Sequence, residues 1–248
     1  MAVVAVTTPA CQRANDGTPD TSSSASSSQP ASSASIAPSA VVFLGTSLTA
    51  GNGLEPDQAY PALIQEKIDS AGLPFRVINA GVSGETSAGG LRRLDWLLRQ
   101  PMAVLVIELG ANDGLRGQDV EAMRANLQAI IDRTRAAHPA ARIVLAGMES
   151  PPNMGGSYTG AFRAVFPDLA RTNDVTLIPF LLDGVAAVRE LNQADGIHPT
   201  AEGHRIVAAT VWRYLAPVLG GSGSGDGSDG SDGSDGNDGS EGGRIGGQ

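Results

Sequence analysis

The sequence predicts an α/β protein, a three-layer α/β/α sandwich with a five-stranded parallel sheet. Two observations favour this class. Short apolar runs of strand type alternate along residues 40–219 with longer segments whose apolar residues recur at spacings of three and four. This alternation is typical of parallel strands joined by right-handed helical crossovers. The run over residues 101–109 is also nearly continuous, which indicates a strand that is buried on both faces.

Five segments have strand character, and the third is the most continuously apolar, so we expect it to be central. The five are residues 41–44, 74–79, 101–109, 142–147 and 175–178. Helical periodicity fills the intervals between them. We expect helices over residues 60–70, 91–98, 119–137, 158–171 and 201–215, with a short helix over 181–191.

The two ends of the chain have too little apolar bulk to offset the entropy of ordering them. Residues 12–39 are rich in Ser, Ala, Pro and Thr, and residues 220–248 repeat Gly-Ser-Asp. We therefore expect a signal-like segment with a disordered linker over 1–39, one domain over 40–219, and a disordered solubilising tail over 220–248. An alternative for the tail is weak Ca²⁺ chelation, but it lacks the repeat of calcium β-rolls.

Composition argues against several classes of function. The net charge of −9 includes six acidic residues in the tail, so the domain itself is only mildly acidic. No basic patch with interleaved aromatic residues indicates nucleic-acid binding. No apolar run approaches the roughly 18 residues of a spanning helix. The single cysteine excludes an internal disulfide and a cysteine metal cluster. The six tail residues are Asp226, Asp229, Asp232, Asp235, Asp238 and Glu241.

The segment before Cys11 resembles a bacterial lipoprotein signal. Small residues precede the cysteine, and a long Ser-rich stretch follows it. The segment lacks a basic start and is shorter than the usual 15–30 residues or so. We expect export, to the periplasm or to a membrane through a lipid on Cys11. The alternatives are a disordered N-terminus and a cytoplasmic protein.

Polar, glycine-bearing stretches follow four of the predicted strands. Ser47 follows the first strand, Gly81 the second and Asn112 the third, and Asp195 and His198 follow the fifth. Because the carboxyl ends of parallel strands meet at one edge of a sheet, we expect these residues to converge.

The converging residue types fit nucleophilic catalysis. A serine hydroxyl needs a base within hydrogen-bond reach. His138 falls at the opposite edge of the sheet, and we expect His204 on a solvated face of the last helix, which leaves His198 as the base. Asp195 can orient that base in a tight loop, although a turn-capping role is the alternative.

An oxyanion requires preorganised hydrogen-bond donors at the same edge. The backbone N–H groups of Gly81 and Ser47 and the side-chain amide of Asn112 are suitable. The alternative for Asn112 is a plain turn, because Asn and Gly favour turns.

Four motifs resemble, in order, the four blocks of the SGNH (GDSL) hydrolase family. They match the branch of bacterial arylesterases and multifunctional acyl-CoA thioesterase/lysophospholipases, and residues 87–94 and 114–117 also look like that branch. The absence of G-x-S-x-G argues against the α/β-hydrolase fold. The motifs are Gly45-Thr46-Ser47-Leu48, residues 79–84 around Gly81, Gly110-Ala111-Asn112-Asp113 and Asp195-Gly196-Ile197-His198-Pro199.

The resemblance implies a flavodoxin-like strand order 2-1-3-4-5, with no metal and no cofactor. It implies that Ser47 is the nucleophile and that Asp195 and His198 complete a catalytic triad. It also implies that Gly81 and Asn112 complete the oxyanion hole.

The chain departs from the family's pattern in two places. Thr46 replaces the aspartate of the usual Gly-Asp-Ser. The sequence therefore does not show which group holds the nucleophile loop in place. The stretch from Ser150 is more polar than the aliphatic-proline stretch of thioesterase members. We expect Leu115, Ser150 and Pro151 to contact substrate, with short to medium acyl chains preferred.

The sequence therefore predicts a monomeric serine esterase that hydrolyses small-molecule carboxylic esters or thioesters through an acyl-enzyme. One alternative is a deacetylase of cell-surface carbohydrate. The other is a tethered, non-catalytic surface-binding protein on the same fold.

Overall fold

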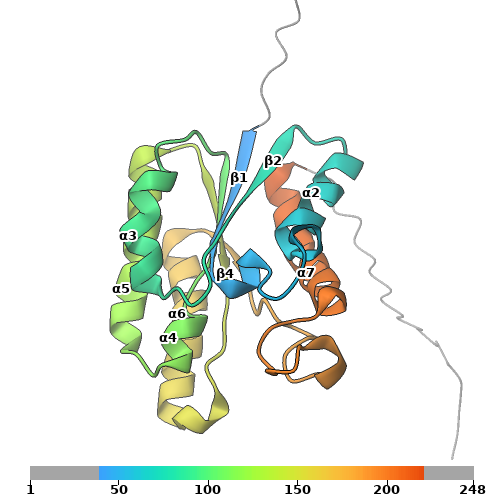
Figure 1. Cartoon of the computed structure of the whole chain (residues 1–248). Coiled ribbons are helices and arrows are strands. Elements are labelled where there is room, and N and C mark those ends of the chain that lie inside the picture. The colour runs from blue at the N-terminus through green and yellow to red at the C-terminus, as the bar shows by residue number, and fades with distance from the viewer. Residues whose placement is uncertain (1–38, 221–248) are drawn as a thin grey trace, which may run out of the picture. The chain divides into compact units, whose positions relative to one another are not determined.

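The computed structural model describes residues 39–220, which form a three-layer α/β/α sandwich (Figure 1). All strand pairs are parallel, and the strand order is β2-β1-β3-β4-β5, as predicted. The predictions for Cys11, the linker and the acidic tail lie outside the described residues. The strands are β1 (Ser39–Gly45), β2 (Phe75–Gly81), β3 (Val104–Glu108), β4 (Arg142–Ala146) and β5 (Thr176–Ile178).

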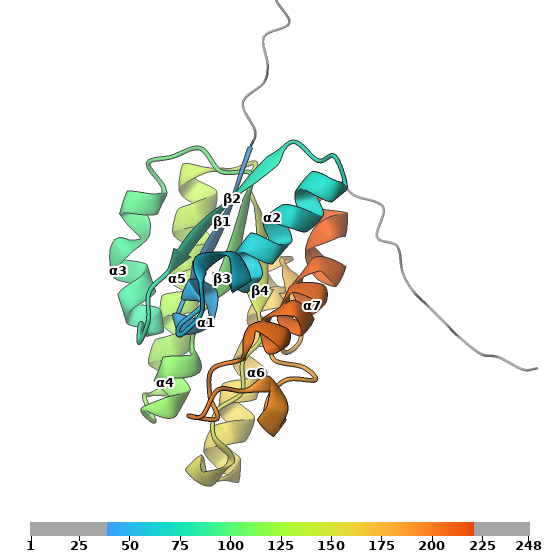
Figure 2. The ribbon, with the colours of Figure 1, turned by 45° about the vertical axis from the view of Figure 1, so that its right-hand side comes forward.

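Two groups of helices cover the two faces of the sheet (Figures 1 and 2). Helices α2 (Tyr60–Ser70) and α7 (Ala201–Leu219) pack together on one face. Helix α5 (Val120–Ala137) packs between α3 (Ser87–Leu97) and α6 (Gly156–Asn173) on the other. Within residues 39–220, no helix has the length and apolarity needed to cross a membrane.

The core lies around β1 and β3. Every residue of β3 is buried, as is every residue of β1 after Ser39, which confirms that the third strand is central. Gly45 pairs with Gly81 of β2 and with Glu108 of β3, so three strands end at the same level. Residues that follow these positions therefore share one edge of the sheet.

Two short helices begin at that edge. Helix α1 (Ser47–Ala50) follows β1, and its N-cap Thr46 accepts a hydrogen bond from the N–H of Leu48. Helix α4 (Ala111–Leu115) follows β3 and contains Asn112, so this asparagine lies in a helical turn. Ser47 and Asn112 therefore both lie in the first helical turn after a buried strand. Within residues 39–220, three 3₁₀ turns complete the elements: η1 (Pro56–Gln58), η2 (Pro152–Met154) and η3 (Arg189–Leu191).

The predicted helix over 181–191 is wrong, because only η3 forms there and turns precede it. Gly184 and Ala187 have positive φ angles of 72° and 62°, which interrupt a right-handed helix. The carbonyls of Val185 and Val188 accept the Asn192 side-chain amide and N–H groups three residues later, in place of α-helical bonds. The segment thereby forms a compact loop beside the sheet edge.

Candidate active site

Ser47, His198 and Asp195 form one hydrogen-bonded chain at the carboxyl edge of the sheet. His198 Nε2 lies 2.8 Å from Ser47 Oγ, and His198 Nδ1 lies 2.6 Å from Asp195 Oδ2. A carboxylate accepts hydrogen bonds, so it favours the tautomer with the proton on Nδ1. Nε2 is then free to accept the serine proton, which is the arrangement that activates a hydroxyl.

Asp195 is held by its own loop. Its Oδ1 accepts the N–H groups of Ile197 at 2.9 Å and His198 at 3.0 Å, and Gly196 between them has a φ of 68°. The hydrogen bond to the His198 side chain, followed by these two N–H bonds, holds the pKa of Asp195 well below its ordinary value. The carboxylate therefore stays ionised throughout the pH range in which a histidine base works.

The nucleophile turn is held from the protein core instead. Thr46 is buried, and its hydroxyl donates to Glu108 Oε1 at 3.0 Å. Thr49 is also buried and donates its hydroxyl to Glu108 Oε2 at 2.7 Å. A side chain at Gly45 would overlap the Thr49 hydroxyl, so glycine is required there. The sequence did not identify Glu108 as a functional residue, although a carboxylate ending an apolar strand was a usable signal.

Three groups beside Ser47 can donate to an oxyanion. The N–H of Ser47 is the first of helix α1, so it has no partner within the helix. The Asn112 side-chain amide donates one hydrogen to the carbonyl of Glu85 at 3.0 Å and retains a second. Gly84 lines a cavity beside Ser47, and its N–H has no acceptor within residues 39–220.

The prediction that Gly81 supplies a donor is wrong in this geometry. The N–H of Gly81 donates to Asn79 Oδ1 at 2.9 Å, and the residue is still part of β2 and does not line the cavity. A Cβ at Gly81 would approach the Ala50 Cα to 2.8 Å, so this glycine allows α1 to pack on β2. The free donor is Gly84, three residues later, because β2 continues further than the apolar pattern indicated.

A cavity of about 500 Å³ opens beside Ser47 and His198. Leu115, Ser150 and Pro151 line it, as do Phe180 and Leu182. The apolar residues among these can accommodate an acyl chain, because pockets for small molecules are lined mainly by apolar side chains. The Ser150 Oγ is buried and has no hydrogen-bond partner among the described residues.

The other two histidines lie away from the reacting atoms. His138 Nε2 lies 2.9 Å from the carbonyl of Leu98, beyond the end of α5. The prediction of a solvated His204 is wrong, because this side chain is buried and its Nδ1 accepts the N–H of Tyr60 at 3.0 Å. Burial, and secondarily the charge of His198, lower the pKa of His204 to about 4. Helical position alone gave no indication that α2 would cover it.

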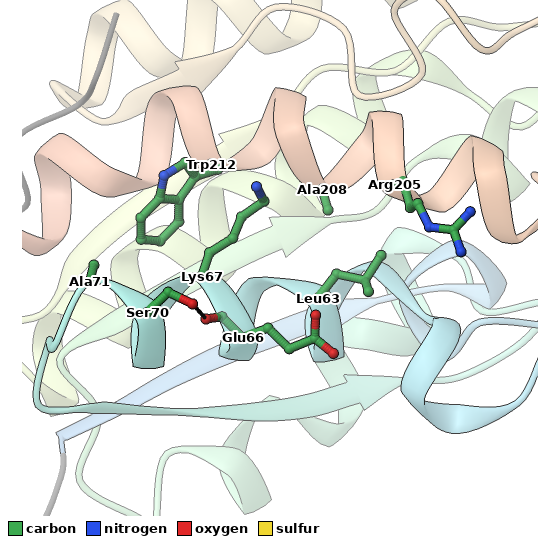
Figure 3. A pocket seen from close by; sticks show the side chains of 8 residues that line it. All are labelled: Leu63, Glu66, Lys67, Ser70, Ala71, Arg205, Ala208 and Trp212. Atoms are coloured by element: carbon green, nitrogen blue, oxygen red, sulfur yellow. Dashed lines mark hydrogen bonds between the residues drawn. The ribbon is translucent and has the colours of Figure 1, made fainter.

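A second hollow of about 570 Å³ lies between α2 and α7 (Figure 3). Lys67, Glu66, Arg205 and Trp212 line it. Its one serine, Ser70, donates to the carbonyl of Glu66 within its own helix, and no histidine lines the hollow. It therefore lacks the paired nucleophile and base of the first cavity.

The fold and this site define a class, an α/β protein with a Ser-His-Asp chain and free donors at the carboxyl edge of a parallel sheet. The chain belongs to the GDSL-like Lipase/Acylhydrolase family, whose model matches residues 43–206. The predicted SGNH (GDSL) family, its fold and the predicted enzyme class are thereby confirmed: the protein is a hydrolase that acts on ester bonds.

Bacterial relatives support the predicted branch of the family. The esterase TesA of Pseudomonas aeruginosa is 41% identical over 180 residues, which cover 72% of this chain and 89% of that protein. Thioesterase 1/protease 1/lysophospholipase L1 of Escherichia coli K12 is 39% identical over 181 residues, covering 72% and 84%. The arylesterase of Vibrio mimicus is 37% identical over 189 residues, covering 76% and 94%.

A solved structure shares the fold as well as the sequence. The psychrotrophic esterase EstA from Pseudoalteromonas sp., inhibited by monoethylphosphonate, aligns with a TM-score of 0.69 and 35% identity. The alignment covers 73% of this chain and 98% of that chain.

Proposed function

We propose that this protein hydrolyses carboxylic esters and thioesters through an acyl-enzyme on Ser47. The observation that carries the proposal is the hydrogen-bonded chain from Ser47 Oγ through His198 to Asp195, with distances of 2.8 and 2.6 Å. Both lie within the reach needed for a base to take the serine proton. This geometry also disfavours the non-catalytic binding protein considered above.

Acylation begins when Ser47 Oγ attacks the carbonyl carbon of the substrate and His198 Nε2 takes the hydroxyl proton. The ionised Asp195 stabilises the imidazolium that forms. The negative charge on the carbonyl oxygen falls beside the N–H groups of Ser47 and Gly84 and the amide of Asn112, which are fixed before the reaction. The tetrahedral intermediate expels the alcohol or thiol, which receives the proton from His198.

Deacylation repeats these steps with water. His198 Nε2 takes a proton from a water molecule that attacks the acyl carbon of the Ser47 ester. The resulting intermediate expels Ser47 Oγ, which recovers its proton from His198, and the carboxylic acid leaves. The free enzyme is restored, so the cycle consumes one water for each ester bond.

The acyl group occupies the apolar cavity, where Leu115, Ser150 and Pro151 contact it. The polar Ser150 in the lining of this cavity supports a preference for short to medium acyl chains over long ones. The relatives' names, an esterase, a thioesterase/lysophospholipase and an arylesterase, support small acyl substrates. The protein acts as a monomer on these substrates.

Residues 40–219 constitute the hydrolase domain, and residues 1–39 direct export and carry a lipid on Cys11. The signal-like residues before Cys11 support this assignment. Intact-mass measurement of full-length protein made in a bacterium checks it. The expected product starts at Cys11 and carries a diacylglyceryl mass.

The test of function is a panel of p-nitrophenyl esters and matched thioesters of increasing chain length, with acetylated sugars as a further arm. Full-length wild type, Ser47→Ala and Ser70→Ala are compared. We expect Ser47→Ala to lose turnover by at least about 10⁴-fold. Ser70→Ala removes an exposed serine hydroxyl in α2 that does not line the cavity beside Ser47, so its turnover stays close to that of wild type. Near wild-type hydrolysis by Ser47→Ala contradicts the mechanism, and preference for acetylated sugars indicates a deacetylase.

A further inference from the structure

A buried polar cluster lies directly beneath the nucleophile turn and has no part in the triad. It consists of Glu108, Thr46, Thr49, Tyr60 and His204, all of which are buried. Glu108 is 1% exposed, and no lysine or arginine side chain pairs with it among the described residues. A carboxyl group buried in this way is unfavourable unless hydrogen bonds compensate for its lost hydration.

The compensating donors come from two residues. The N–H of Thr46 donates to Glu108 Oε2 at 2.8 Å, and the N–H of Thr49 donates to the same oxygen at 3.2 Å. The two hydroxyls add bonds at 3.0 Å from Thr46 and 2.7 Å from Thr49. One carboxyl group therefore gathers two backbone donors and two side-chain donors.

These donors flank Ser47 on both sides. Thr46 directly precedes the serine and is the N-cap of α1, and Thr49 lies two residues after it in the same helical turn. The bonds thereby fix the backbone on either side of the position that presents Oγ and the N–H of Ser47. A displacement of about 1 Å in a reacting group can lower a rate by about 10²-fold.

The cluster continues into helix α2. The Tyr60 hydroxyl lies 2.7 Å from Thr49 Oγ1, and because Thr49 donates to Glu108, the tyrosine is the donor in that pair. The N–H of Tyr60 donates to His204 Nδ1 in α7 at 3.0 Å. Glu108 is thus linked to the two helices that cover one face of the sheet.

We propose that Glu108 is a positioning residue for ester hydrolysis, because it holds the turn that presents Ser47. Thr46 supplies a hydroxyl donor to that carboxyl group at the position where the family's pattern has an aspartate. The inference rests on the proposed function of Ser47. It extends the reaction's requirements to a residue that does not touch the substrate.

The experiment compares Glu108→Leu with Glu108→Gln in the full-length protein. Leucine removes every acceptor, whereas glutamine keeps an oxygen that can accept the N–H groups of Thr46 and Thr49. We expect Glu108→Leu to lower kcat by about 100-fold with KM changed by less than about threefold, and Glu108→Gln to restore kcat to within about tenfold of wild type. Near-equal kcat values for the two folded variants overturn the proposal.

A matched control separates positioning from general loss of stability. Asn173 is a buried polar residue at the end of α6, where it exchanges hydrogen bonds with Gln128 of α5, and it does not line the cavity beside Ser47. Asn173→Ala should lower the melting temperature while kcat stays within about twofold of wild type. If Asn173→Ala lowers kcat as much as Glu108→Leu does, the effect is structural and the proposal is wrong.

Thr46 provides a second test if Glu108→Leu fails to fold. Thr46→Ser keeps the hydroxyl donor, and Thr46→Val replaces it with a methyl group of similar size. The proposal requires kcat of Thr46→Val to fall about tenfold or more below that of Thr46→Ser at unchanged KM, and equal values overturn it. Ser47→Ala in the same assay tests the nucleophile separately, since its activity bears on the proposed function and not on Glu108.

Discussion

The two halves of the active site are held in opposite ways. The nucleophile turn, residues 45–51, is bonded to Glu108, which lies about 60 residues further along the chain. The base loop, residues 192–199, holds its catalytic groups by bonds within three residues, and the Asp195 side chain is 44% exposed. One half is therefore an extension of the core, and the other is a surface loop whose catalytic carboxylate is held by the backbone of the same loop.

This difference predicts how the two halves respond to substitution. Changes in the base loop should alter the chemistry while leaving the free energy of unfolding nearly unchanged, because few buried contacts are lost. Changes beneath the nucleophile turn should alter both the turnover and the free energy of unfolding, because buried donors then lose their acceptor. Stability and turnover measured together therefore distinguish the two halves.

The largest expected effect in the base loop is that of Asp195→Asn. An amide cannot select the tautomer of His198 that leaves Nε2 free, so we expect kcat to fall by up to about 10⁴-fold. The melting temperature should change by less than about 4 °C, the shift that about 1 kcal/mol produces in a domain of this size. Steady-state kinetics and thermal unfolding of the same preparation check both values. A large loss of stability would show that Asp195 also holds the folded structure together, contrary to the proposed difference between the two halves.

Asn112→Ala is expected to have the next largest effect. It removes one oxyanion donor, so kcat should fall by about 10²–10³-fold with KM nearly unchanged. Asn126→Ala is a suitable control, because that amide donates to Ser87 Oγ at 3.0 Å and does not line the cavity. If the two variants have equal kcat and KM values, Asn112 does not donate to the oxyanion.

Gly81, the last residue of β2, and Gly84, which follows the strand, differ in what an added methyl group would meet. Gly81→Ala forces a methyl group into the backbone of α1, so we expect destabilisation of about 1–3 kcal/mol by overpacking. Gly84→Ala meets no atom closer than 3.6 Å, but Gly84 has a φ of 77°, so strain of about 1–2 kcal/mol is expected. Gly84→Ala keeps its N–H, so any loss of kcat must come from the altered backbone. Chemical denaturation and kcat for both variants test these expectations.

The smallest effect concerns His204 and the pH dependence of stability. The pKa of His204 is about 4 in the folded protein, against an ordinary value of 6.5, so the unfolded chain binds more protons between these values. The stabilisation from keeping His204 neutral is present above about pH 6.5 and is lost as the pH falls toward 4. His204→Asn keeps an acceptor for the N–H of Tyr60 but does not titrate. Its free energy of unfolding should therefore vary less than that of wild type over this range, and an unchanged slope would contradict the assignment.

The fold and the converging residues could be predicted because both depend on local patterns. Alternating strand and helix periods determine a parallel sheet, and a parallel sheet brings its strand ends to one edge. Ser47, Asn112 and His198 therefore meet without any knowledge of side-chain contacts. The order β2-β1-β3-β4-β5 came from the family resemblance and is the observed order.

The predictions that were wrong or incomplete depend on contacts between residues that are far apart in the chain. The sequence could not show that β2 extends through Gly81, which moves the free N–H to Gly84. Nor could it show that α2 covers His204, or that Thr46 meets Glu108, since each contact joins elements far apart in the chain. The sequence therefore did not show that Glu108 holds the nucleophile turn in place.

Ser47 Oγ, activated by His198, is the atom that we propose becomes acylated. Intact and peptide mass spectrometry after treatment of the full-length protein with a fluorophosphonate tests this assignment. We expect one adduct, on Ser47, that is absent in Ser47→Ala and forms much more slowly in His198→Ala. An adduct on another residue, or equal labelling of Ser47→Ala, would contradict it.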